Sequence, residues 1–162
     1  MSYKLVSERP EHAGEIERVL DRAFGPGRFA KTSERVRERG AVFEPSLSRV
    51  ALDDDGAVLG CSRIWRVSVG GAPAFFLGPL AVDPGAQHHG LGASLVRDAL
   101  SACRASGLGG GVILVGAESF FKPLGFFPDP ARPGDLARSG RRAPPALGRA
   151  SPRRLGQGGG AG

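Results

Sequence analysis

One segment of the chain, from Leu80 to Leu95, holds the residues whose types and spacing point most directly to chemistry. A strand-like apolar run ends at residues 83–85 (Asp-Pro-Gly), and two closely spaced glycines, Gly90 and Gly92, lead into a predicted helix. Glycine lets the backbone approach a bulky ligand because no Cβ intervenes. The first turn of a helix carries unpaired N–H groups and the positive end of the helix dipole. The segment therefore predicts a site for a ligand that carries a diphosphate.

Two well-known glycine loops do not fit this segment. A dinucleotide-binding loop needs a third glycine where Leu95 stands, and an acidic residue about 20 positions further on, which is missing. A P-loop needs a Gly-Lys-Ser/Thr sequence, but no lysine lies between Lys31 and Lys122. A plain turn that starts a helix and binds nothing is the remaining alternative.

Two motifs together resemble the GNAT superfamily of acetyl-CoA-dependent N-acetyltransferases, in its small, single-domain bacterial form. The first is Gln-x-x-Gly-x-Gly at residues 87–92, preceded by the run Leu-Gly-Pro-Leu-Ala-Val-Asp-Pro at 77–84. The second is Phe-Phe-Lys-Pro-Leu-Gly-Phe at 120–126. The resemblance, which covers residues 3–127, implies an α/β (α+β) fold with a mixed, mostly antiparallel central sheet, splayed central strands and flanking helices. It also implies acetyl-CoA as co-substrate and direct acetyl transfer to an amine of a small molecule or peptide.

The same resemblance assigns roles around the first motif. Backbone groups of the strand would bind the pantetheine arm of the coenzyme, while the loop and the start of the helix would surround its pyrophosphate. Two adjacent histidines could instead indicate a metal site, but no third ligand cluster lies nearby in the sequence, and no metal is predicted. The implied donor-binding residues are Leu80, Ala81, Val82, Gln87, His88, His89, Gly90, Leu91, Gly92 and Ala93.

The second motif departs from the family in a way that affects catalysis. Phe121 stands where many relatives carry a tyrosine that protonates the leaving thiolate, and phenylalanine has no proton to give. Loss of a general acid commonly slows a reaction about 10²–10⁴-fold. A catalytically weak or inactive acyl-CoA-binding protein is therefore the alternative function. Core packing is the simpler role for Phe120, Phe121 and Phe126. Glu118, the nearest acid by sequence to the presumed thiol, is the candidate general base.

Four further polar or aromatic side chains have no assigned role in the reaction. Arg63 and Trp65 could line an acceptor pocket, although a half-buried strand explains them equally well. Glu44 and Asp98 are expected to be solvated or helix-surface charges.

Hydrophobic periodicity predicts the elements that must position these residues. Pro79 lies inside a predicted central strand and has no N–H to donate, so pairing there must fail through a bulge or a free edge. Strands are predicted over 3–8, 48–52, 58–69, 74–82 and 112–115, with turns at 53–56 and 70–71. Helices are predicted from Pro10 with an apolar stripe of Ile16, Val19, Leu20, Ala23 and Phe24, and over 29–39, 91–106 and 119–124.

Size and charge restrict the class of protein. A chain of 162 residues suits one domain. Its net charge of +6 comes mostly from residues 128–162, which hold 7 Arg against 2 Asp, while residues 1–127 hold 15 Lys and Arg against 14 Asp and Glu. Nucleic-acid binding is therefore not the favoured function. Cys61 and Cys103 are predicted to be buried thiols in a reducing cytoplasm, and no apolar run is long enough to span a membrane.

The last part of the chain has a different composition. Residues 128–162 are rich in Pro, Gly and Arg and hold few large apolar side chains. Such a segment cannot bury enough surface to offset its ordering entropy. We therefore expect an acetyltransferase domain at 1–127 and a poorly ordered tail. The two further strands that usually close a GNAT sheet are not recognisable there, and a shifted reading frame is an alternative origin of the tail. A homodimer is left open.

Overall fold

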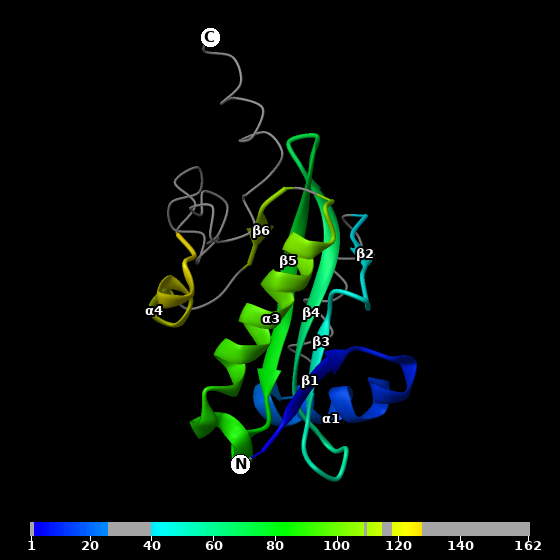
Figure 1. Cartoon of the computed structure of the whole chain (residues 1–162), viewed down its shortest axis with the longest axis vertical. Helices are drawn as coiled ribbons and strands as arrows, with labels where there is room; N and C mark the ends of the chain where they lie inside the picture. The colour runs from blue at the N-terminus through cyan, green and yellow to red at the C-terminus, as the bar shows by residue number, and fades with distance from the viewer. Residues whose placement is uncertain (1, 26–39, 109, 115–117, 128–162) are drawn as a thin grey trace.

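The computed structural model describes residues 2–25, 40–108, 110–114 and 118–127. Within these residues one sheet has the strand order β1-β3-β4-β5-β6, and β2 pairs with β4 outside this path (Figure 1). Every pairing is antiparallel except that of β5 with β6. This confirms the mixed, mostly antiparallel sheet. The strands are β1 (Lys4–Ser7), β2 (Val42–Phe43), β3 (Arg49–Leu52), β4 (Val58–Val69), β5 (Ala72–Val82) and β6 (Val112–Ile113).

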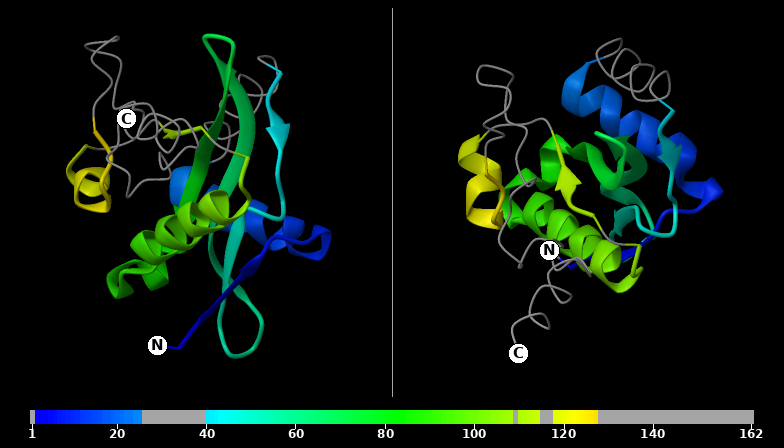
Figure 2. Two further views of the ribbon diagram at one scale, coloured as in Figure 1. Left: turned by 45° about the horizontal axis from the view of Figure 1, so that its top comes forward. Right: turned by 90° about the horizontal axis from the view of Figure 1, so that it is seen from above.

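Helices α1 (Ala13–Phe24) and α3 (Leu91–Ala105) pack on opposite faces of this sheet (Figure 2). Successive strand residues point to opposite faces. Accordingly, Val50 of β3 packs in the cluster of α1, while its neighbour Ala51 packs against α3. The remaining helical segments are short: η1 (Pro10–His12), η2 (Pro84–His89), α4 (Glu118–Phe121) and η3 (Lys122–Leu124).

The predicted strands and helices correspond closely to the observed ones, except that the short strand β2 was not predicted and the apolar stripe of α1 contains one error. Ile16, Val19 and Leu20 are buried, as predicted, and Ala23 packs beside them. Phe24 is 41% exposed, so its place in the buried stripe was wrong. The reason is that the cluster under α1 ends at Ala23, and the last residue of the helix projects beyond it. The helix expected over 29–39 and the tail after 127 lie outside the described residues.

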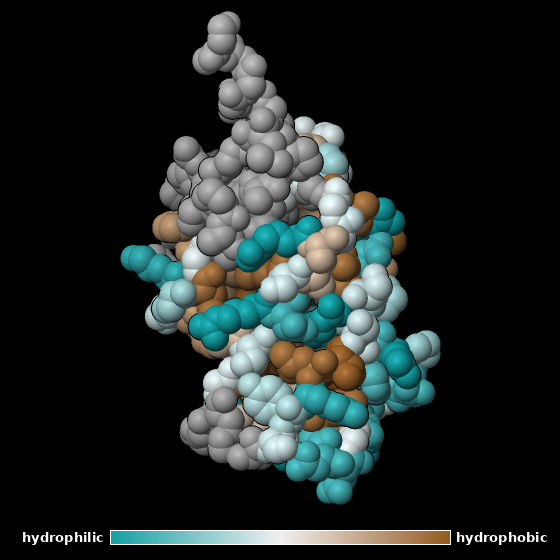
Figure 3. Space-filling model, in the orientation of Figure 1, coloured by the Kyte–Doolittle hydropathy of each residue, from teal (hydrophilic) through white to brown (hydrophobic). Residues whose placement is uncertain are grey.

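The core face of α3 is buried as predicted. Its contacts continue the main hydrophobic cluster across β4, β5 and β6 to the aromatic residues of the second motif. On the face seen in Figure 3, apolar surface is interrupted by hydrophilic residues. The buried α3 positions that the sequence predicted are Leu95, Val96, Ala99, Leu100 and Cys103.

Strand β5 contains a bulge at the proline, as predicted. Ser62 of β4 is opposite Leu80, but Ile64 is opposite Leu77. One residue of β4 therefore faces two residues of β5, Gly78 and Pro79. Gly78 has a φ of +152°, a backbone conformation that side chains rarely adopt, and the Gly78–Pro79 peptide bond is cis.

Both cysteines are free thiols buried in the core, which confirms the predicted burial. Cys61 lies in the cluster under α1, and Cys103 belongs to α3. Burial raises the pKa of each thiol from its ordinary value to about 12. Both are therefore protonated at neutral pH. No described helix is long and apolar enough to cross a bilayer.

Candidate active site

The amino-terminal end of α3 lacks a side-chain cap. Its N-cap residue is Gly90, whose φ of +66° is the left-handed conformation that glycine adopts at little cost. No side chain caps the helix, and its first turn contains no acidic residue. The positive, amino-terminal end of this 15-residue helix is therefore not compensated by a carboxylate in its first turn. Such a helix start favours an anionic ligand.

The loop before this helix is held in shape by Asp83. One carboxylate oxygen, Oδ1, accepts the N–H of Gly85 at 2.9 Å, and the backbone carbonyl accepts the N–H of Ala86 at 2.8 Å. The other carboxylate oxygen lies 2.8 Å from Nη1 of Arg22 on α1. Gln87 extends the same network, since its Nε2 donates to the carbonyl of Val82 at 3.4 Å. The loop is thus formed by internal contacts of the chain.

Strand β5 presents backbone groups beside this loop. The N–H of Asp83 donates to the carbonyl of Leu59 on the β4 side at 2.7 Å. Backbone groups of an antiparallel strand point alternately to its two neighbours. The amides of Leu80 and Val82 consequently point away from β4. The register of β6 with β5 reaches only as far as Phe76 within the described residues. An extended amide ligand could pair with the remaining part of β5.

Three other predicted donor residues occupy distinct places around this strand and loop. Ala81 turns its side chain into the cluster under α1, and Leu91 is fully buried beneath the loop. Their side chains therefore serve packing, and any contact with a donor would come from the backbone. Ala93 is half-buried in the first turn of α3. The side chains of His88, His89 and Glu118 lie outside what the structure describes.

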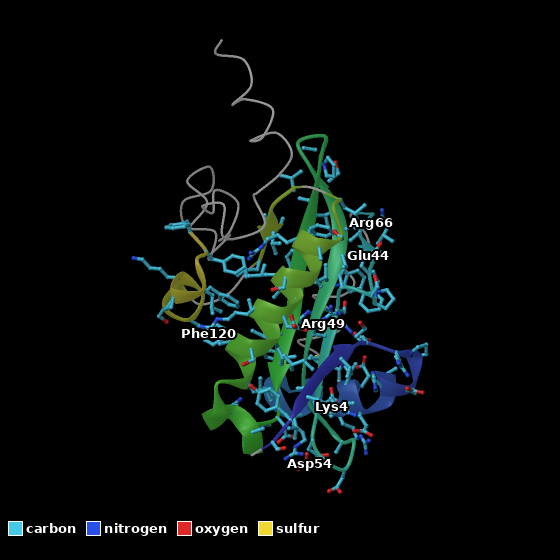
Figure 4. The ribbon with its side chains drawn as sticks, in the orientation of Figure 1. Lys4, Glu44, Arg49, Asp54, Arg66 and Phe120 are labelled. Carbon is cyan, nitrogen blue, oxygen red and sulfur yellow. The ribbon has the colours of Figure 1, made fainter. Side chains whose placement is uncertain are left out.

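Gly92 is close to a second element that the sequence did not link to it. A Cβ on Gly92 would lie 3.3 Å from Cζ of Phe120 and 3.6 Å from Cγ2 of Val82. The small size of Gly92 therefore allows the ring of Phe120, which reaches from α4 toward α3 in Figure 4, to cover the first turn of the helix.

The three aromatic residues of the second motif do not share one role. Phe121 and Phe126 are buried and meet edge to face, with ring centroids 5.7 Å apart. Phe120 is 41% exposed, so its prediction as a core residue was wrong. Adjacent residues of a helix point about 100° apart, and here one of the two rings faces the core. Phe121, the residue at the tyrosine position, is the one that does.

Three arginines of the sheet, Arg49, Arg63 and Arg66, are engaged in ion pairs. Arg63 donates to the buried carboxylate of Glu8, with Nη2 2.8 Å from Oε1, and lies over the ring of Phe43. Among the described residues, neither Arg63 nor Trp65 extends freely into solvent, so strand packing accounts for both. The sequence did not single out Glu8, which is 55 positions from its partner.

Glu44 was wrongly predicted to be a solvated charge, whereas Asp98 is a helix-surface charge on α3, as predicted, with its side chain 42% exposed. Glu44 pairs with Arg66, and Figure 4 shows both residues beside β2. Asp98 accepts a hydrogen bond from Nε of Arg49 at 2.6 Å. The partners come from other strands or helices, which the sequence pattern does not reveal. Among the residues that the structure describes, no group of three or more His, Cys, Asp or Glu is placed to hold a metal ion.

One hydroxyl contact links the amino-terminal segment to helix α3. The OH of Tyr3 lies 2.9 Å from Oγ of Ser94 in the first turn of α3. The Arg22–Asp83 ion pair similarly connects the loop before α3 to α1. Neither contact could be recognised in the sequence, because both join segments far apart in the chain.

Comparison with known proteins agrees with this geometry. The chain is 40% identical over 105 residues to the mycothiol acetyltransferase of Beutenbergia cavernae, covering 63% of this chain but only 34% of that protein. It is 32% identical over 121 residues to the uncharacterized N-acetyltransferase YhbS of Escherichia coli K12, covering 74% of this chain and 70% of that one.

Solved structures give the same result. A GNAT family acetyltransferase from Brucella melitensis in complex with acetyl-CoA superposes with a TM-score of 0.67 at 30% identity, covering 88% of each chain. The E. coli YhbS structure in complex with CoA superposes with a TM-score of 0.73 at 28% identity, covering 90% of this chain and 84% of that one. The model of the Acetyltransferase (GNAT) family matches residues 14–126. The chain therefore belongs to the GNAT family of acetyltransferases.

Proposed function

We propose that this protein is an N-acetyltransferase that moves the acetyl group of acetyl-CoA directly to an amine. The observation that carries the proposal is the uncapped start of α3 at Gly90, next to the outward-facing amides of Leu80 and Val82. The first feature suits a diphosphate, and the second suits the amide-bearing pantetheine arm. Two similar structures, those of B. melitensis and E. coli, contain acetyl-CoA and CoA respectively.

The donor would lie along β5 with its diphosphate at the loop. Backbone N–H groups of residues 87–93 would bind the phosphate oxygens, and the side chain of Gln87 would contribute at the rim. His88 and His89 belong to the same part of the loop and would add polar contacts at its mouth. Leu80, Ala81 and Val82 would provide the strand that the pantetheine arm follows.

The transfer forms one bond and breaks one. The nitrogen of the neutral amine attacks the carbonyl carbon of the thioester, a C–N bond forms, the C–S bond breaks and CoA leaves as a thiolate. The amine proton must pass to a base, for which Glu118 is our candidate. Phe121 cannot protonate the thiolate, so the leaving group departs without help from that position.

A covalent cysteine intermediate does not fit this site. The nucleophile in such a mechanism is a thiolate, and burial raises the pKa of both Cys61 and Cys103 to about 12. These are the two cysteines of the chain. Direct attack by the amine is therefore the mechanism that we propose.

The acceptor is an amine of a small molecule or peptide. We assign the acetyltransferase domain to residues 1–127, in keeping with a family match that ends at residue 126. A cytoplasmic location is part of the same proposal and is supported by the two unpaired thiols. Sedimentation analysis will test whether the protein forms a homodimer.

Two measurements test the proposed function. Calorimetry with acetyl-CoA should detect binding, and absence of heat or of a thermal shift at millimolar ligand would end the proposal. Thiol release should then be followed with a panel of amines. Release that depends on an amine supports the enzyme, whereas binding without release with any amine would identify a protein that only holds the donor.

A further inference from the structure

The bulge in β5 changes which residues face the donor. Before the bulge, the N–H of Phe75 donates at 2.9 Å to the carbonyl of Gly111, on the β6 side. After it, the N–H of Asp83 donates to Leu59, on the opposite, β4 side. Both residues are odd-numbered, so a regular strand would point their amides the same way. The extra residue at Gly78–Pro79 reverses the alternation, and it is this reversal that turns Leu80 and Val82 outward.

The side chain of Trp65 holds the bulge. Its indole Nε1 donates to the carbonyl of Gly78 at 2.7 Å. Trp65 is buried on β4, opposite Phe76 of β5, so its ring reaches along the neighbouring strand to the bulge. Strands β4 and β5 lie side by side along this length in Figure 1. A side chain thus satisfies the carbonyl at the point where the register of the two strands shifts.

The indole is itself held from a second side. The ring of Phe43 on β2 lies against it with centroids 5.1 Å apart and planes tilted by 51°. The guanidinium of Arg63 covers Phe43 at 5.4 Å and is fixed by Glu8. These contacts restrict the rotamer of Trp65, and a preorganised donor loses little entropy when it holds a backbone carbonyl.

We propose that Trp65 is a positioning residue of the donor site. It acts through Gly78: the indole N–H fixes the bulge, and the bulge aims the amides of Leu80 and Val82 at the pantetheine arm. This inference rests on the proposed function, since it concerns how the same site holds acetyl-CoA. It predicts that loss of one N–H group weakens binding of the arm but not binding of the diphosphate.

The test compares two ligands on the full chain. Acetyl-CoA carries both the diphosphate and the pantetheine arm, whereas ADP carries the diphosphate without the arm. Trp65→Phe should weaken acetyl-CoA binding about tenfold, the effect of losing one well-placed hydrogen bond. Its affinity for ADP, followed by NMR titration of backbone amides, should stay within about twofold of wild type. Ser106→Ala is the matched control, because it removes a side-chain bond to the carbonyl of Cys103 at the far end of α3. It should change neither affinity.

A second substitution keeps the test decisive if the phenylalanine variant unfolds. Trp65 is the chain's single tryptophan, so replacing tryptophan with benzothienylalanine exchanges one N–H for sulfur at one site. Unchanged acetyl-CoA affinity in a folded variant would overturn the inference. So would an equal loss for acetyl-CoA and ADP, which would indicate a general structural role. If the wild-type protein binds neither ligand, the proposed function fails instead.

Discussion

Helices α1 and α3 begin with similar residues but treat their positive ends differently. Each has glycine as its second residue, Gly14 in α1 and Gly92 in α3. The third residue is Glu15 in α1, where the carboxylate also accepts the N–H of Val58 at 2.8 Å. In α3 it is Ala93, and the first turn has no acid. Glu15 therefore compensates the dipole of α1, which only supports the sheet. The dipole of α3 has no such partner in its first turn and can interact with a ligand.

The arrangement before each helix strengthens this contrast. Helix α1 continues from η1, and the N–H of Ala13 is already bonded to the carbonyl of Pro10. Neither helix has a side-chain cap, but α3 starts at a left-handed glycine. The absence of an acidic residue from the first turn therefore distinguishes the proposed anion site from an ordinary helix start as much as the glycine at the N-cap does.

Making the start of α3 resemble that of α1 should have the largest effect. Ala93→Glu would place a carboxylate within one turn of the bound diphosphate, and acetyl-CoA affinity measured by calorimetry should fall about 100-fold. Ala13→Glu adds the same charge to the exposed first turn of α1 and is the control, with affinity expected to match wild type. Equal affinities for both variants would mean that the start of α3 is not the anion site.

The start of α3 is proposed to act in donor binding and not in the chemical step. A substitution at Phe121 should therefore change the rate of acetyl transfer without changing the affinity for acetyl-CoA. Phe121→Tyr supplies a proton donor at the position where the family resemblance implies one, and kcat should rise about tenfold, below the full range for a general acid because the side chain is buried. The Kd for acetyl-CoA should remain unchanged. Steady-state kinetics with the best amine gives kcat, and calorimetry gives Kd. A weaker Kd with unchanged kcat would place Phe121 in the donor site instead.

One buried thiol, Cys61, packs under α1 and the other, Cys103, belongs to α3. Because both are buried, we predict that the protein loses stability at alkaline pH. The unfolded thiols ionise near pH 9.0, whereas burial raises the folded pKa of Cys61 and Cys103 to about 12. The stabilisation is complete below pH 9.0 and is lost as the pH rises toward 12, by about 1.4 kcal/mol per pH unit for each thiol. Urea unfolding across this range should show the loss. The Cys61→Ala/Cys103→Ala double variant should lack that part of the pH dependence; an identical curve would contradict the assignment.

The smallest effect should distinguish the two glycines at the second helical position. A Cβ on Gly14 meets nothing within 4 Å, so Gly14→Ala should raise the free energy of unfolding by about 0.5–1 kcal/mol. Gly92→Ala should give no such gain, because its Cβ would press on the ring of Phe120 at 3.3 Å. Thermal unfolding of both variants gives the comparison. A similar gain at both positions would show that Phe120 moves aside freely.

The features that could be predicted from the sequence are those that depend on local pattern. Apolar periodicity located α3 and its buried face, and the long strand β4 has the predicted ends. Pro79 predicted the bulge because a residue without an N–H must interrupt a ladder wherever it lies. The glycine loop was recognisable because the left-handed conformation at Gly90 depends on the residue type at that one position.

The features that could not be predicted depend on partners far along the chain. Pro79 and the family resemblance led us to expect free backbone groups at Leu80 and Val82, but the direction of their amides follows from the register between β4 and β5, which no single segment contains. Likewise, the partner of Arg63 is 55 positions away. The choice between Phe120 and Phe121 as the core residue depends on where α4 packs, and the motif alone treats both alike.

The position of Trp65 behind the bulge has a practical consequence. Because the chain contains one tryptophan, its tryptophan emission comes from a single indole whose N–H is bonded to the strand that we expect acetyl-CoA to contact. The emission maximum should therefore respond when the thioester arm is seated. Stopped-flow recording of this signal would give association and dissociation rates for unlabelled ligands.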